Sequence, residues 1–103
     1  MTNQNNSTDS VELELARESL RKDVELAEDL ADLMQNDKFI NVFVENFCKT
    51  VVAEETKRLI SQNEIVREAA LEKIKAAKYL EAYMDYVKDC GTAAKADLLE
   101  GGL

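Results

Sequence analysis

No proline interrupts this chain of 103 residues, and its three glycines stand at positions 91, 101 and 102. Proline and glycine are the residues that most often end helices and form tight turns. The chain before Gly91 therefore contains no strong signal that stops a helix. Apolar residues recur there at intervals of three and four, which is the spacing of one helix face. The sequence predicts an all-α protein built from long helices.

The first predicted helix covers residues 10–35. Residues 1–9 are polar after Met1 and offer nothing to a core, so we expect them to form a disordered tail. Asn36 or Asp37 provides an N-cap for the next helix. One continuous helix through Asn36 is the alternative. The apolar stripe of the first helix consists of Leu13, Ala16, Leu20, Val24, Ala27, Leu30, Ala31 and Met34.

The second predicted helix covers residues 37–60 and contains all three phenylalanines of the chain. Its apolar residues surround most of its circumference, which is typical of a buried helix. We therefore expect Phe43 and Phe47 to be core residues, whose replacement by alanine costs roughly 3–5 kcal/mol.

The third predicted helix covers residues 63–90. Ser61 and Glu64 match a capping box at its start. Gly91 is placed to end it in the left-handed conformation. Thr92 then caps a short fourth helix over residues 93–100.

Helices of this length joined by short links pack antiparallel. We predict an antiparallel three-helix bundle, or an extended helical hairpin, with a short fourth C-terminal helix, in a single domain of residues 10–100. Folding the third helix back on the second brings together Val51 and Ile74, Phe47 and Ala77, and Phe43 and Leu80. The first helix would bring Leu13 near Leu59. In an alternative arrangement, the first helix projects and pairs with another chain.

The net charge of −8 is concentrated at the start of the chain, where residues 1–37 carry −7. This balance argues against direct binding to nucleic acid, which requires basic surface. The acidic side chains of the first helix form either a solvated face or a surface for a basic partner. The candidate partner-binding acids are Glu14, Glu18, Glu25, Glu28, Asp29 and Asp32.

Three tyrosines, Tyr79, Tyr83 and Tyr86, follow one another at helical spacing on the third helix. Tyrosine is enriched at protein interfaces, so the three form a candidate recognition stripe. They also fit a second core stripe, because the third helix of a bundle contacts both neighbours.

The chain has no histidine, which removes histidine-based acid–base and nucleophilic catalysis and nearly all zinc sites. We expect no catalytic, cofactor or metal site. Cys48 and Cys90 should be free thiols, because antiparallel packing places Cys48 opposite residue 76, roughly 21 Å along the axis from Cys90. No signal peptide or apolar run long enough to cross a membrane is present, so we expect neither secretion nor membrane association.

Two segments, QNDKFINVFVENFCKTVVAEETKRL and AAKYLEAYMDYVKDCGTAAKADLL, cover much of the chain from Met34 onward. In these segments the chain is similar to small acidic all-helical proteins of unknown function from the structural gene clusters of tailed bacteriophages. The shared features are a polar break before a phenylalanine-rich helix, an acidic-then-basic turn, and a third helix rich in tyrosine and leucine. No functional residue carries over from the resemblance.

The resemblance implies a structural or assembly component of a virion, located in the virion or the host cytoplasm. Together with the helix pattern, it predicts a protein that acts through protein–protein contacts and forms a homo-oligomer or larger assembly. The alternative is an acidic regulatory protein, a nucleic-acid mimic or inhibitor that binds a basic groove on a host protein.

Overall fold

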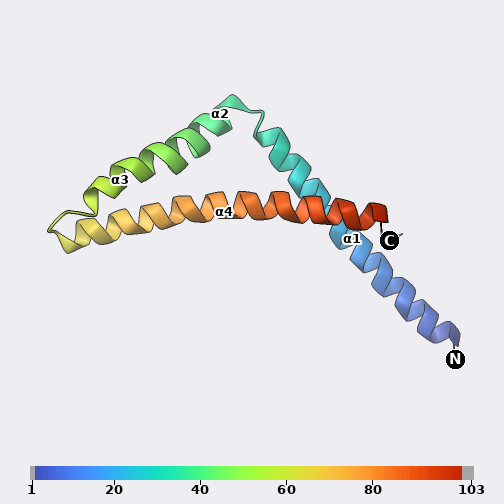
Figure 1. Ribbon diagram of the computed structural model, residues 1–103. Coiled ribbons are helices and arrows are strands. Elements are labelled where there is room, and N and C mark those ends of the chain that lie inside the picture. Colours follow the sequence, from blue (N-terminus) through green and yellow to red (C-terminus); the bar gives the residue numbers. More distant parts are fainter. Residues whose placement is uncertain (1, 101–103) are drawn as a thin grey trace. The chain divides into compact units, whose positions relative to one another are not determined.

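A computed structural model describes residues 2–100 of the chain, with side chains from Asp9 onward, and every regular element in this part is a helix. The elements are α1 (Thr2–Leu33), α2 (Asp37–Phe39), the π-helix η1 (Ile40–Val51), α3 (Val52–Arg58) and α4 (Glu64–Glu100), as Figure 1 shows. The prediction of an all-α protein is confirmed.

The chain divides into two compact units. The terminal unit is formed by the described parts of Met1–Leu30 and Tyr86–Leu103, and the central unit is Ala31–Asp85. The uninterrupted helix α4 contributes residues to both. The predicted three-helix bundle and single domain therefore stay predictions, as does the proximity of Leu13 to Leu59, which belong to different units.

Helix α1 begins earlier than predicted. Met1 lies outside the described residues, but the helix already includes Thr2 to Asp9, where we expected a disordered tail. Starting a helix is costly, because several residues must be ordered for the first hydrogen bond. Extending a helix orders only one residue for each further hydrogen bond, so polar residues can continue a helix that they would not start.

The break after α1 is real, and the alternative of a continuous helix is wrong. Asn36 is the N-cap of α2, as predicted. Its side-chain oxygen accepts hydrogen bonds from the backbone N–H groups of Lys38 at 2.9 Å and Phe39 at 3.1 Å.

The predicted helix 37–60 is present as α2, η1 and α3 in direct succession. Its middle, however, is a π-helix of twelve residues, an unusual length for a helix type that mostly occurs as single turns. Thr50 fits this geometry, because its hydroxyl donates to the carbonyl of Glu45, five residues earlier, at 3.1 Å. The hydrophobic period alone does not distinguish this wider helix from an α-helix.

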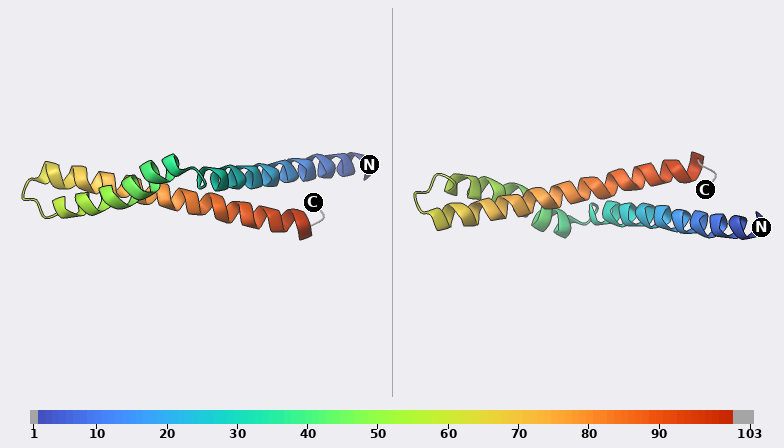
Figure 2. Two further views of the ribbon diagram at one scale, coloured as in Figure 1. Left: turned by 90° about the horizontal axis from the view of Figure 1, so that it is seen from above. Right: turned by 90° about the horizontal axis from the view of Figure 1, so that it is seen from below.

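The start of α4 differs from the predicted capping box. Asn63, rather than Ser61, accepts hydrogen bonds from the first backbone N–H groups of the helix, Ile65 at 2.9 Å and Val66 at 3.4 Å. The hydroxyl of Ser61 instead accepts from the N–H of Asn63 at 3.1 Å and orders the turn. The two views of Figure 2 show α3 and the first turns of α4 side by side on either side of this turn.

The predicted end of the third helix at Gly91 is wrong, and so is the separate helix 93–100. Helix α4 continues to Glu100, and the hydroxyl of Thr92 donates to the carbonyl of Lys88 at 3.0 Å instead of capping a new helix. A single glycine costs a helix only about 1 kcal/mol relative to alanine. The alanine-rich sequence that follows favours continuation.

The core of each unit is thin. In the central unit α4 presents the buried residues Ala70 and Ala77, and in the terminal unit it presents Val87, Gly91 and Ala94. Small side chains at this heptad-like spacing let a neighbouring helix approach closely. In the central unit the Sγ atom of Cys48 donates to the carbonyl of Ala77 at 3.8 Å, one residue from the predicted register.

The prediction that the phenylalanine-rich helix is buried all round is wrong. Phe43 is 44% exposed, Val42 is also exposed, and Cys48 is the one residue of η1 that is buried. Phe39 and Phe43 stack against each other with ring centroids 5.2 Å apart. This helix is apolar on most sides, and the exposure of Val42 and Phe43 shows that the chain covers it incompletely.

Candidate protein-interaction surface

Helix α4 carries a second heptad stripe beside the buried one. Its positions alternate by four and three residues, which is the spacing of a coiled-coil seam. All of its members are exposed in the structure. We call this stripe the tyrosine seam; it consists of Ile65, Ala69, Glu72, Ala76, Tyr79, Tyr83 and Tyr86.

The three tyrosines are the largest side chains of the seam. Tyr79 is 80% exposed, Tyr83 is 52% exposed and Tyr86 is 64% exposed. The interpretation of these residues as a second core stripe is therefore wrong in this structure. Their role in partner binding stays a prediction, and its physical basis is the row of apolar ring surface that they leave in solvent.

The acidic face of α1 is exposed along its described length. Two of its acids have basic neighbours on the same helix: Glu14 pairs with Arg17 at 3.3 Å and Glu18 with Arg21 at 3.8 Å. Such exposed pairs contribute little stability. All six predicted acids lie in solvent: Glu14, Glu18, Glu25, Glu28, Asp29 and Asp32.

The turn between α3 and α4 leaves further apolar side chains in solvent. Ile60, at 88% exposure, and Leu59 lie in the turn itself. A shallow groove beside them is lined by Leu59, Glu64, Arg67, Glu68 and Leu71. One N–H group of the Arg67 guanidinium donates to the carbonyl of Ser61 at 2.6 Å.

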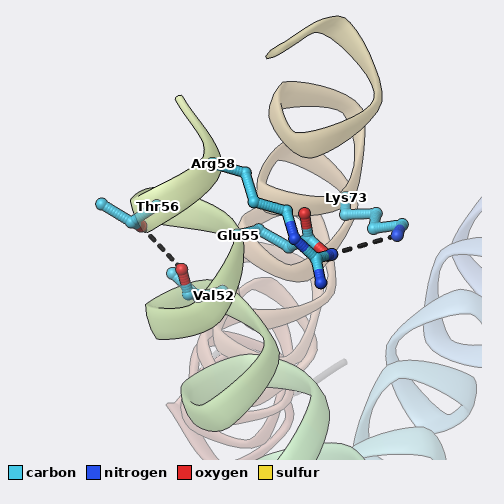
Figure 3. Close-up of polar contacts among 5 residues, drawn as sticks. All are labelled: Val52, Glu55, Thr56, Arg58 and Lys73. Atoms are coloured by element: carbon cyan, nitrogen blue, oxygen red, sulfur yellow. Dashed lines mark hydrogen bonds and ion pairs between the residues drawn. The ribbon is translucent and has the colours of Figure 1, made fainter. Parts of the chain in front are cut away.

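Glu55 is the one buried charged residue among those that the structure describes, and sequence reasoning missed it. Its carboxylate, with the side chain 6% exposed, accepts from Arg58 Nη1 at 2.6 Å and Lys73 Nζ at 3.2 Å (Figure 3). Arg58 lies one turn further along α3, whereas Lys73 comes from α4. The pair Glu55–Lys73 therefore links α3 to α4. In the predicted antiparallel register Glu55 lies opposite Ala69 or Ala70 and not opposite Lys73, so the sequence contained no direct signal for this pair.

The two cysteines are free thiols, as predicted, with Cys48 buried and Cys90 half-buried. Burial raises the pKa of the Cys48 thiol, and the carboxylate of Glu81 raises that pKa further. Cys48 is therefore a small core residue and not an activated nucleophile.

Within the described part of the chain, no cluster of three metal-ligating side chains occurs. In the same part, every helix is too short or too polar to cross a bilayer. The two main candidate surfaces are the tyrosine seam of α4 and the acidic face of α1, and exposed helix faces of this kind can bind other proteins.

The chain was compared with known protein families, curated proteins and solved structures. No protein-family model matches the chain, and neither a curated protein nor a solved structure matches it.

Proposed function

We propose that this protein is a non-enzymatic structural or assembly component that acts through protein–protein contacts and associates into oligomers. The observation that carries the proposal is the tyrosine seam, an unbroken row of solvent-exposed seam positions along α4. Isolated apolar residues are common on protein surfaces, but aligned apolar and aromatic side chains, interrupted in this seam by Glu72, are typical of an interaction site.

The thin core supports the same proposal. Among the described residues no large side chain is fully buried. A small helical domain with so little buried area gains much of its stability from association, because association covers the apolar faces that the chain alone leaves in water.

The resemblance to small helical proteins of tailed-phage structural gene clusters extends the proposal to a virion component. In that setting the protein would be located in the virion or, before assembly, in the host cytoplasm. Its partners would be other protein subunits, with no direct contact to nucleic acid or membrane.

A second candidate is an acidic regulatory protein that binds a basic groove on a host protein. The exposed acids of α1 support it, because carboxylates facing solvent along one helix produce a strongly negative face. Binding of this kind would weaken steeply with salt, whereas association through apolar faces would not.

Size-exclusion chromatography with light scattering, at low and high salt, tests the proposal. A defined oligomer larger than 11.6 kDa whose mass is independent of salt supports an assembly component. A chain that stays monomeric at all concentrations, and binds a basic protein only at low salt, contradicts that proposal and favours the acidic regulator.

A further inference from the structure

We propose that the tyrosine seam is the dimerisation surface, and that the seam of a second copy of this chain occupies it in antiparallel orientation. This inference rests on the proposed function and deepens it by naming the surface, the partner and the orientation. Three observations carry it: the spacing of the seam, the charge of the helix that bears it, and the order of its side chains.

The spacing provides a continuous surface on one rigid element. From Ile65 to Tyr86 the seam follows α4 for about 32 Å at the rise of an α-helix. The alternation of four and three residues keeps all seven positions on one side of the helix. The buried stripe with Ala70 and Ala77 lies beside it and already packs within the chain. The exposed seam positions from Ile65 to Tyr83 are therefore available to a helix from another chain.

Charge favours a second copy at this surface over the acidic face of α1. Residues 1–37 carry a charge of −7, so two α1 helices would repel each other. Residues 64–90 of α4 hold six acids and five bases, which gives −1. Lys75 lies beside the seam and pairs with Glu72 at 3.9 Å. Two copies of this nearly neutral helix can approach each other.

The order of the side chains selects the antiparallel orientation. The first half of the seam contains both of its alanines, and the tyrosines occupy the second half. In a parallel pair each tyrosine would lie opposite the same tyrosine of the second copy, and each alanine opposite the same alanine. The tyrosine layers of the interface would then be overpacked, and the alanine layers would contain cavities. In an antiparallel pair Tyr79 meets Ala76, Tyr86 meets Ala69, and Tyr83 meets Glu72.

The antiparallel layers are complementary in volume and in polarity. A large residue opposite a small one is how facing helices fill the space between them. The hydroxyl of Tyr83 would be placed to donate to the carboxylate of Glu72 of the second copy. The next layer brings Ile65 of one copy opposite Cys90 of the other.

Sedimentation equilibrium of the full chain tests the surface. Tyr79→Glu places a charge in the middle of the seam at an exposed helix position, so the monomer should keep its fold. We expect the dimer dissociation constant to rise by about 30-fold or more, as for an aromatic hot spot. Ile60→Glu is the matched control, since Ile60 is also a large hydrophobic residue and is more exposed than Tyr79 but lies outside the seam. Its dissociation constant should equal that of the wild type.

Cysteine crosslinking tests the orientation. Ile65→Cys should form a disulfide with the native Cys90 of the second copy under mild oxidation, identified by peptide mass mapping. Residues 65 and 90 lie about 37 Å apart on one helix, so this bond cannot form within a chain. Glu64→Cys, one residue away and off the seam, should not form it.

Each alternative outcome is distinct. A 65–65 disulfide would overturn the antiparallel orientation. An oligomer that Tyr79→Glu leaves intact would overturn the seam as the interface, while the proposed assembly function would stand. A wild-type chain that remains monomeric would overturn both.

Discussion

Gly91 on α4 lies so close to Ala27 on α1 that a Cβ atom added to the glycine would overlap the Cβ of that alanine. The same added atom would lie 3.4 Å from the carbonyl oxygen of Asp23. The absence of a side chain at position 91 therefore allows the two helices of the terminal unit to touch. The glycine serves close packing within a helix and does not end it.

Gly91→Ala should destabilise the protein even though alanine is the better helix former. The gain in helix propensity is about 1 kcal/mol. Forcing a methyl group into a closely packed contact typically costs about 1–3 kcal/mol. We expect a net loss of roughly 1–2 kcal/mol in urea unfolding followed by circular dichroism. A variant more stable than the wild type would contradict the contact with Ala27.

Exposed Ala93 provides the control for Gly91. Ala93→Gly changes helix propensity without changing a helix contact, and should cost about 0.5–1 kcal/mol. The two substitutions together separate the intrinsic effect of glycine from the effect of the contact.

Glu55 and Lys73 should show a favourable coupling energy. A double-mutant cycle with Glu55→Gln and Lys73→Met, measured by chemical denaturation, should give about 0.5–2 kcal/mol. The exposed pair Lys49–Glu45, at 3.2 Å, is the control and should couple by at most about 0.5 kcal/mol. Equal coupling in both pairs would show that burial of Glu55 does not strengthen its ion pair.

Asn63→Ala should destabilise the protein by about 1 kcal/mol, because it removes the cap of α4. Ser61→Ala should cost less, since Ser61 satisfies one N–H group of the turn and none of the helix. Thermal melts of the two variants compare the caps directly. A larger loss for Ser61→Ala would favour the capping box predicted from the sequence.

Cys48 and Cys90 should differ in reactivity toward an alkylating reagent. Cys90 is half-buried and should be labelled first, whereas Cys48 should be labelled only when the chain opens. Labelling at equal rates under native conditions would contradict the burial of Cys48.

The raised pKa of Cys48 also predicts a pH dependence of stability. In the folded protein the thiol has a pKa above its ordinary value of 9.0, because burial disfavours the thiolate. Its contribution to stability is therefore present below pH 9.0 and is lost as the pH rises beyond it. The free energy of unfolding should fall less between about pH 8 and about pH 10 in Cys48→Ala than in the wild type.

Phe43→Ala should cost less than the 3–5 kcal/mol expected from the sequence, because Phe43 is 44% exposed. We expect about 1 kcal/mol, mostly from the lost contact with Phe39, and a larger loss for the half-buried Phe47. Urea denaturation of both alanine variants checks this order. If both variants lost about 3–5 kcal/mol of unfolding free energy, Phe43 would be covered in solution, for instance by a second chain.

Periodicity predicted the helices of this protein well and their ends less well. The break at Asn36 was found because an asparagine there can cap the helix that follows. The end at Gly91 was misplaced because the same residue type serves both helix ends and close helix contacts, and only the position of α1 distinguishes the two. The choice between Ser61 and Asn63 as cap depends on the backbone path of the turn, which local sequence does not determine.

The candidate site was predicted in part. The tyrosines were recognised by their spacing, but their exposure depends on which stripe of α4 packs within the chain. Both stripes have helical spacing, and the buried one is built mainly from small residues rather than from the large ones that usually mark a core. Glu55 was missed because its burial arises from contact between two helices and leaves no trace in local composition.

The π-helix η1 has an energetic consequence for the ion pair that follows it. Each of its hydrogen bonds spans one more residue than in an α-helix, so the same twelve residues make fewer turns and reach a shorter distance. If η1 tightened into an α-helix, α3 would be pushed along its axis and rotated, and Glu55 would leave Lys73. Glu55 would then keep Arg58 on its own helix but lose its partner on α4, and a buried carboxylate that loses a partner is destabilised. The ion pair thus penalises the ordinary helix and helps to hold the rare one.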